Sequence, residues 1–197
     1  MNRNLEIDPD QNFFDNLFPY LDSAIQSKYY DVNKFNSEFE HNLNDIFCIS
    51  YNIRSFERNI EEFISYISQL NTKPKILIFT ETWYSAGNCQ NLDSYRGFHI
   101  TRPTIRGGGV SVYIHDSISC KFISNFSICN EDIEICTVEL NLENREITLF
   151  AVYRPHSGTL DNFSQFLFSF LESNSKNALV LGDFNVDILR NSTHISN

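Results

Sequence analysis

The sequence has few basic residues for its length. Its 197 residues include 15 lysines and arginines against 25 aspartates and glutamates, which gives a formal net charge of −10. A protein that binds nucleic acid strongly by itself usually carries a basic surface. The acidic balance therefore argues against a free-standing, high-affinity nucleic-acid binder. Much of the acid excess lies in residues 1–45, which hold nine acids and three bases.

Paired cysteines are also missing from the sequence. No two cysteines form a Cys-x-x-Cys pair, and no histidine lies at a zinc-ligand spacing from any of them, so a zinc site is not predicted. The odd count and the strand position of Cys48 favour free thiols in a reducing compartment. The five cysteines are Cys48, Cys89, Cys120, Cys129 and Cys136.

Long apolar runs are absent as well. No stretch approaches the length of a membrane span, and the segment Met1–Glu6 has no apolar core of a signal peptide. We expect an intracellular protein, nuclear or cytoplasmic, with no membrane partner. Residues 1–45 are interpreted as an acidic N-terminal extension with a short helix or two, and residues 46–197 as a single domain.

From residue 46 onward, the patterns of strands and helices alternate. Apolar spacing predicts one helix over 59–70 and a second around 163–171, with Ser157 or Thr159 available as its cap. This order indicates a mixed α/β layer architecture, and the patterns alone leave three and four layers open. The predicted strands are 46–49, 76–81, 109–114, 133–140, 146–153 and 178–183.

Polar side chains end four of these strands. Asp183 and Asn185 follow the apolar run 178–181, and side chains two residues apart on an extended chain point the same way. We therefore expect both to face one common point. Asn52, Glu81 and Tyr153 end three other strands, so the sequence predicts a site that holds a metal and a phosphate.

Five motifs, in this order and spacing, resemble the endonuclease/exonuclease/phosphatase superfamily over about residues 46–190. The nearest resemblance is to the endonuclease domain of non-LTR (LINE-type) retrotransposon polyproteins, and the stretch before residue 46 is also similar. The motifs are Tyr51-Asn52-Ile53-Arg54-Ser55, Thr80-Glu81-Thr82-Trp83, Arg106-Gly107-Gly108-Gly109-Val110, Val152-Tyr153-Arg154-Pro155 and Gly182-Asp183-Phe184-Asn185.

This resemblance implies the fold and the activity. The fold is a four-layer α/β sandwich, with two mostly antiparallel sheets packed face to face and helices outside. The activity is Mg²⁺-dependent nicking of one DNA strand, with Mn²⁺ as the alternative metal. In the family, the freed 3′-hydroxyl primes a downstream reverse-transcriptase domain, which would be a partner of this chain. The acidic charge suggests weak DNA binding, helped by neighbouring domains.

The resemblance also implies roles at the metal and the phosphate. Glu81 is the expected metal ligand, and Asn52 is expected in the metal shell or on a phosphate oxygen. Asp183 would accept a proton from the attacking water or orient it, and Asn185 would donate to the charge that develops on phosphorus. A simple turn after the strand is the alternative for Asp183 and Asn185. Tyr153 is expected to contact the phosphate.

Two arginines are candidates for binding the substrate. Arg154 and Arg106 could each contact a DNA phosphate, although a plain surface position is equally compatible with Arg154. The glycines after Arg106 precede a strand instead of a helix, so they lack the helix N-terminus of a phosphate-binding loop. We interpret them as a flexible strand entry. Trp83 is expected to anchor the loop after Glu81.

The family pattern continues to a Ser-Asp-His motif that the sequence does not show. The chain has twelve residues after Asn185, and His194 stands in Ser192-Thr193-His194-Ile195 without the aspartate. We therefore expect a C-terminally truncated domain that lacks the last strands and has little or no activity. Two alternatives stay open: a phosphatase or abasic-site nuclease of the same superfamily, and a non-enzymatic remnant that binds DNA or a partner.

Overall fold

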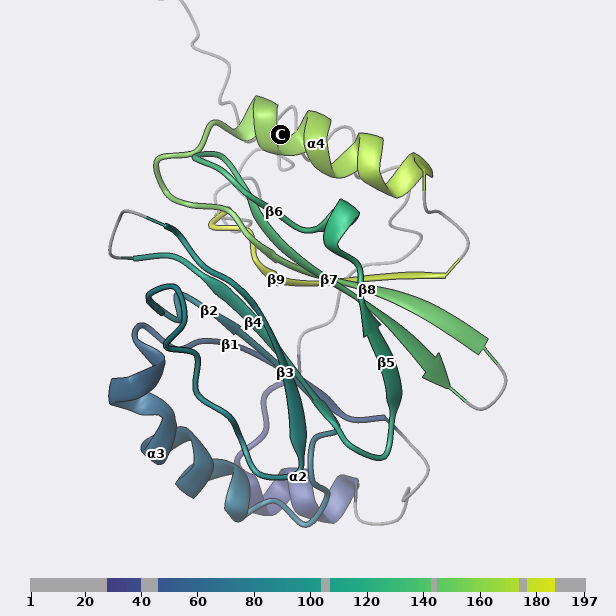
Figure 1. Ribbon diagram of the computed structural model, residues 1–197. Coiled ribbons are helices and arrows are strands. Elements are labelled where there is room, and N and C mark those ends of the chain that lie inside the picture. The colour runs from purple at the N-terminus through teal and green to yellow at the C-terminus, as the bar shows by residue number, and fades with distance from the viewer. Residues whose placement is uncertain (1–27, 40–45, 104–106, 143–144, 174–176, 187–197) are drawn as a thin grey trace, which may run out of the picture.

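Two β-sheets lie face to face, and helices cover their outer faces (Figure 1). This computed structural model describes residues 28–39, 46–103, 107–142, 145–173 and 177–186. The order of layers is helix, sheet, sheet, helix, so the predicted α/β sandwich is confirmed. None of the helices in the described ranges is long and apolar enough to cross a membrane.

Sheet A contains a βαβ unit at the start of the domain. Strands β1 (Cys48–Asn52) and β2 (Ile76–Thr80) are parallel and joined by helix α3 (Phe56–Ser68). Strand β4 (Val110–His115) pairs in antiparallel fashion with β2 and with β3 (Tyr95–Ile100). Every residue of β2 is buried, as expected for a central strand covered on both faces. The spatial order is β1, β2, β4 and β3.

Sheet B also contains a βαβ unit, which lies at the C-terminal end of the described chain. Strands β8 (Arg145–Tyr153) and β9 (Ala178–Asp183) are parallel and joined by helix α4 (Leu160–Ser173), and the remaining strands pair in antiparallel fashion. The spatial order is β5 (Ser119–Phe122), β7 (Glu134–Leu142), β8 and β9. The short strand β6 (Ile128–Cys129) pairs with β7 after a 3₁₀ turn, η2 (Ser124–Phe126).

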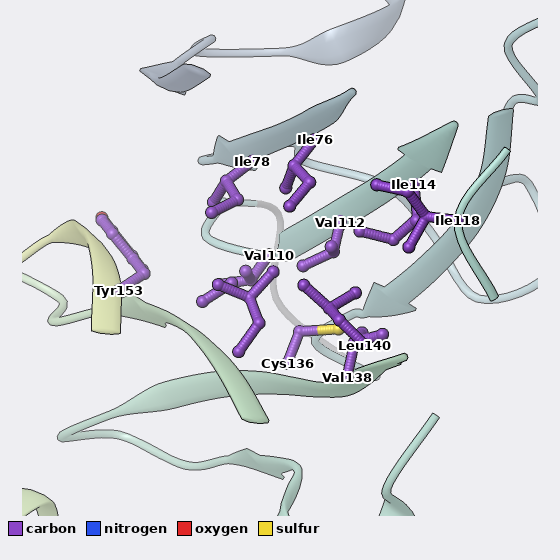
Figure 2. Close-up of a cluster of buried hydrophobic side chains, with 12 residues drawn as sticks. Ile76, Ile78, Val110, Val112, Ile114, Ile118, Cys136, Val138, Leu140 and Tyr153 are labelled. Atoms are coloured by element: carbon purple, nitrogen blue, oxygen red, sulfur yellow. The ribbon is translucent and has the colours of Figure 1, made fainter. Parts of the chain in front are cut away.

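Alternation of side chains along the strands produces three apolar layers. In β2, Ile76 and Ile78 point between the sheets, while Leu77 and Phe79 pack against α3. The same alternation in β8 sends Phe150 toward α4. Figure 2 shows the layer between the sheets, with Tyr153 at its margin. This position of Tyr153 matters for the site described below.

The N-terminal extension contributes helix α2 (Val32–Glu38) in its described part. Asp31 caps this helix by accepting a hydrogen bond from the Lys34 amide at 2.8 Å. The Asn36 side chain bonds the carbonyl of Gln69 and the amide of Asn71, each at 2.8 Å. The extension therefore packs on the end of α3 through these bonds, at least over residues 28–39.

The observed elements differ from the predicted ones in instructive ways. Helix α3 begins at Phe56, three residues before the predicted start, because the buried Phe56 ring packs on Phe79 and its amide bonds the Thr82 carbonyl. The last turn of α3 ends earlier than predicted, at Ser68. Strands β3, β5 and β6 were not predicted, because their half-exposed residues carry little apolar alternation.

The half-buried histidine of β3 makes the stability of the fold sensitive to mild acid. His99 bonds Ser111 through Nδ1 and packs edge-on to Tyr84 and Tyr113. Burial lowers the pKa of His99 from the ordinary 6.5 to about 4. Below pH 6.5 the unfolded chain therefore binds a proton at this residue that the folded chain does not, until about pH 4.

We expect His99→Gln to flatten the dependence of stability on pH between 6.5 and 4. The parent chain loses free energy of unfolding as the pH falls through this window, because only its unfolded state gains the His99 proton. Urea titrations at several pH values measure the slope. His115→Gln, on the same sheet, is the control. An equal slope in the parent and in His99→Gln would contradict the prediction.

Candidate functional site

Four of the predicted site residues lie at one edge of the sandwich, where the two sheets meet. Asn52 ends β1, Glu81 directly follows β2, Tyr153 ends β8 and Asp183 ends β9. Because β1 and β2 are parallel, and β8 and β9 are parallel, each pair brings its carboxyl ends to the same edge. The crossover helices α3 and α4 make this parallel pairing possible.

The carboxamide of Asn52 joins the two sheets at this edge. Its Nδ2 donates one hydrogen bond to Glu81 Oε1 and a second to Asp183 Oδ2, each at 2.8 Å. Asn52 and Asp183 are 131 residues apart in sequence, so only the tertiary fold brings them together. Both protons of the amide are used by carboxylates, which fixes the orientation of the side chain.

Tyr153 completes the cluster from the layer between the sheets. Its hydroxyl donates to Glu81 Oε1 over a long 3.4 Å. Burial raises the pKa of Tyr153 to about 12, and the nearby carboxylates of Glu81, Glu134 and Asp183 add to this shift. The phenol therefore stays protonated at neutral pH and acts as a hydrogen-bond donor.

Glu81 lies on a turn that the backbone holds in an unusual conformation. Glu81 and Trp83 have positive φ angles of 54° and 56°, which residues with a side chain rarely adopt. Three backbone bonds hold the turn: Ser55 donates to the Glu81 carbonyl at 2.8 Å, Trp83 to Gly108 at 2.9 Å, and Thr82 to Gly109 at 3.3 Å. Such conformations persist where the surrounding structure fixes them, often at functional sites.

The residues of the cluster suit a magnesium ion. The Oδ1 atom of Asn52 is buried and has no hydrogen-bond partner among the described residues. With the carboxylate of Glu81 it offers hard oxygen atoms, and Mg²⁺ takes only one or two protein carboxylates together with several waters. No group of three or more His, Cys, Asp or Glu suited to a metal occurs in the described ranges. The donor atoms that Asn52 and Glu81 supply are oxygens, the kind of ligand that Mg²⁺ takes in proteins.

Asn185 does not face the common point that its spacing predicted. The chain leaves the extended conformation after β9, and Asn185 has a φ of +49°. Its amide donates to Asp183 Oδ1 at 3.0 Å, which forms a turn, and its Nδ2 donates to the Arg154 carbonyl at 2.6 Å. The prediction is wrong on this point, because the i, i+2 rule holds only on an extended chain.

Arg154 has a structural position instead of the predicted contact with a DNA phosphate. The residue is only 8% exposed. Its guanidinium donates to the carbonyls of Phe184 at 2.7 Å, Gly158 at 2.9 Å and Asn185 at 2.5 Å. This arginine therefore holds the turn that carries Asp183. Arg106, the other predicted contact, lies outside the described residues.

An acidic residue that the motif analysis did not single out lies beside the cluster. Glu134 on β7 is completely buried; its Oε2 accepts from the Gly109 amide at 2.6 Å and its Oε1 from Arg102 Nε at 2.5 Å. Burial raises the pKa of Glu134 above its usual value, and Arg102 opposes this shift. A charged residue in phase with the buried Cys136 and Val138 is the sequence signal that could have revealed it.

Comparison with known families identifies the fold. Residues 49–193, about three quarters of the chain, match the endonuclease/exonuclease/phosphatase family. The chain belongs to this family. No match was found among curated proteins.

Two solved structures show the same family fold at low sequence identity. The endonuclease domain of TRAS1, a telomere-specific non-LTR retrotransposon, is 16% identical with a TM-score of 0.56, covering 72% of this chain and 61% of that domain. An AP endonuclease from Archaeoglobus fulgidus is 14% identical with a TM-score of 0.51, covering 70% of this chain and 56% of the enzyme. The chain thus spans about three fifths of the length of these structures.

The Asn52 amide bridges two carboxylates, and replacing it tests this bridging role. In Asn52→Asp, two donors are lost and a third carboxylate faces Glu81 and Asp183, so we expect a loss of about 2–3 kcal/mol without metal. Addition of Mg²⁺ should recover part of this loss and stabilise the variant more than the parent. Thermal unfolding with and without Mg²⁺ measures both effects. Asn91→Asp, at an exposed position, is the control. Equal metal-free stability of Asn52→Asp and the parent would contradict the proposed bridging role.

A second test concerns the glycine that precedes Asp183. Gly182 has a φ of +149°, and a Cβ at this position would lie 1.8 Å from the Val152 carbonyl oxygen. Gly87 also has a positive φ, of 85°, but a Cβ there would meet nothing within 4 Å. We expect Gly182→Ala to destabilise the fold by about 1–3 kcal/mol more than Gly87→Ala, because only the former adds overlap to backbone strain. Urea unfolding measures the difference. Equal losses of free energy of unfolding in Gly182→Ala and Gly87→Ala would contradict the prediction, because they would mean that β8 and β9 shift apart without cost to admit the added Cβ.

Proposed function

We propose that this chain is a divalent-metal-dependent phosphodiesterase that nicks one strand of DNA. The observation that supports the proposal most directly is the Asn52 amide, which bonds Glu81 and Asp183 across the two sheets and leaves a buried acceptor oxygen unused. This arrangement offers a cation site and a separate carboxylate at one point. The motifs that resemble non-LTR retrotransposon endonucleases favour DNA as the substrate.

The residues of the cluster divide the work of hydrolysis. Glu81 and Asn52 would hold Mg²⁺ or Mn²⁺, and the bound metal would supply positive charge to the phosphate. Asp183 accepts or orients a proton of the attacking water, since its Oδ2 lies at the cluster while Oδ1 is used by the turn. The protonated Tyr153 donates a hydrogen bond toward the phosphate.

We expect this chain to have little or no activity, with slow turnover at most. None of the histidines in the described ranges is hydrogen-bonded to Asn52, Glu81, Tyr153 or Asp183. The histidine that the family's Ser-Asp-His motif implies is therefore not seen at this cluster among the described residues. In a longer polyprotein, the freed 3′-hydroxyl would prime synthesis by a reverse-transcriptase domain inside the cell.

A plasmid-nicking assay tests the proposed reaction. Supercoiled DNA is incubated with the chain and Mg²⁺ or Mn²⁺, and conversion to the open circle is measured. We expect Glu81→Gln and Asp183→Asn each to reduce the rate by about 100-fold or more, because one removes a metal ligand and the other the proton acceptor. Glu146→Gln, at the exposed opposite end of β8, is the matched control and should nick at the parent rate.

The same preparations distinguish the alternatives. Nicking that all three variants share would come from a contaminant and would refute the site. Cleavage confined to duplexes with an abasic site would make this an abasic-site nuclease. Release of phosphate from inositol polyphosphates without DNA cleavage would favour a phosphatase. Stable folding without metal response, cleavage or phosphate release would indicate a non-enzymatic fragment.

A further inference from the structure

A groove adjoins the cluster on the side of the Glu81 turn. It has a volume of about 610 Å³, within the rough range of 300–1,000 Å³ that is common for ligand sites. None of the cluster residues Asn52, Glu81, Tyr153 and Asp183 lines this groove. The residues that matter here are Ser55, Thr82, Trp83, Tyr84, Asn88 and Arg102.

The groove is fixed to the metal-ligand turn by backbone bonds. The amide of Ser55 donates to the Glu81 carbonyl at 2.8 Å, and that of Phe56 donates to the Thr82 carbonyl at 2.9 Å. Thr82 and Trp83 directly follow Glu81 in the chain. A ligand in this groove would therefore lie next to a group held by Glu81, at a distance set by two rigid backbone connections.

Arg102 is the only cationic residue among the described residues that line the groove. Its Nε donates to Glu134 Oε1 at 2.5 Å, and Glu134 is fully buried and further held by the Gly109 amide. The terminal nitrogens of Arg102 make no hydrogen bond within the described part of the chain, and 22% of the side chain is exposed. The buried carboxylate thus holds the guanidinium in place and leaves its donors for a ligand.

The lining restricts the chemistry of that ligand. Apart from Arg102 and the exposed Glu57, the named groups are hydroxyls, amides and the Trp83 and Tyr84 rings. Such a surface suits one anionic group beside an uncharged planar or hydroxyl-bearing group. A phosphodiester with its nucleoside has this composition, and phosphate contacts from a fixed arginine position a nucleic acid without reading its sequence. Because the chain carries a net charge of −10, fixed local cations are required for such binding.

We propose that Arg102 binds a phosphate that flanks the scissile phosphodiester, in the groove between Ser55 and Trp83, with Glu134 as the residue that positions its guanidinium. This proposal rests on the proposed function, because it requires a nucleic-acid substrate. The groove would hold the part of the substrate DNA strand that lies next to the scissile phosphate, on the side of Glu81.

The dependence of DNA binding on salt tests the proposal. Arg102→Gln alone would leave Glu134 buried without its cation, so Arg102→Gln is combined with Glu134→Gln, and Glu134→Gln by itself is the matched control that keeps Arg102. Binding of a fluorescent duplex to the full chain is measured by anisotropy without divalent metal over a range of KCl concentrations. Circular dichroism verifies that each variant is folded.

We expect the double variant to lose one phosphate contact relative to the Glu134→Gln control. The slope of log Kobs against log[KCl] should become shallower by about 0.9, with roughly five- to tenfold weaker binding at 100 mM salt. The control keeps the arginine but loses the carboxylate that positions it, so its binding should fall between that of the parent and that of the double variant, with a slope still steeper than that of the double variant. An equal slope in the double variant and in the control would overturn the proposal.

A second measurement uses the parent protein and does not depend on the folding of any variant. Phosphates on either side of the nick are replaced one at a time by neutral methylphosphonates. One flanking position should weaken binding five- to tenfold, and no effect at any flanking position would overturn the proposal. If Asp183→Asn abolishes nicking but the double variant has the same salt slope as the Glu134→Gln control, only the Arg102 site is refuted. A parent chain that neither binds nor nicks DNA would refute the proposed function as well.

Discussion

The hydrogen bonds of the Asn52 amide are the interaction on which the site depends. One nitrogen atom bonds a carboxylate on its own sheet and another on the opposite sheet, each at 2.8 Å. Without it, Glu81 and Asp183 would be two negative groups meeting at a half-buried edge, where like charges repel strongly. The neutral amide keeps the two carboxylates together. The same contact ties the carboxyl ends of the two sheets at one point.

The rest of the architecture serves to deliver strand ends to that point. Each sheet contributes a parallel pair, β1 with β2 and β8 with β9, and each pair is joined by a helix on the outer face. Backbone conformation then aims the individual side chains. Glu81 takes a left-handed conformation, Gly182 passes close to Val152, and Arg154 bonds the carbonyls of the turn after Asp183. Local strain at this edge is thus supported by long-range contacts.

The buried carboxylate of Glu134, outside the cluster, is also held by hydrogen bonds from other elements. Glu134 is completely buried. Its two oxygens accept hydrogen bonds from the Arg102 guanidinium and the Gly109 amide, which offsets the cost of burying the carboxylate. It connects β7 of one sheet to the glycine segment that borders the Glu81 turn of the other. Sequence motifs emphasise strand ends, so a residue at the start of β7 is easily passed over, although its phase with buried apolar neighbours marks it as inward-facing.

The sequence by itself determined the main strands, the two amphipathic helices and the polar residues at four strand ends, because periodicity and local order reflect burial directly. Family membership followed from motifs in a fixed order. Only the tertiary structure decided which groups meet: that Asn52 bonds Asp183 across 131 residues, that Asn185 turns away to bond a carbonyl, and that Arg154 is buried while Arg102 lines a groove. A pattern along the chain specifies which face a side chain takes in its own element. Contacts between elements depend on register, crossover direction and backbone turns, which are properties of the packed chain as a whole.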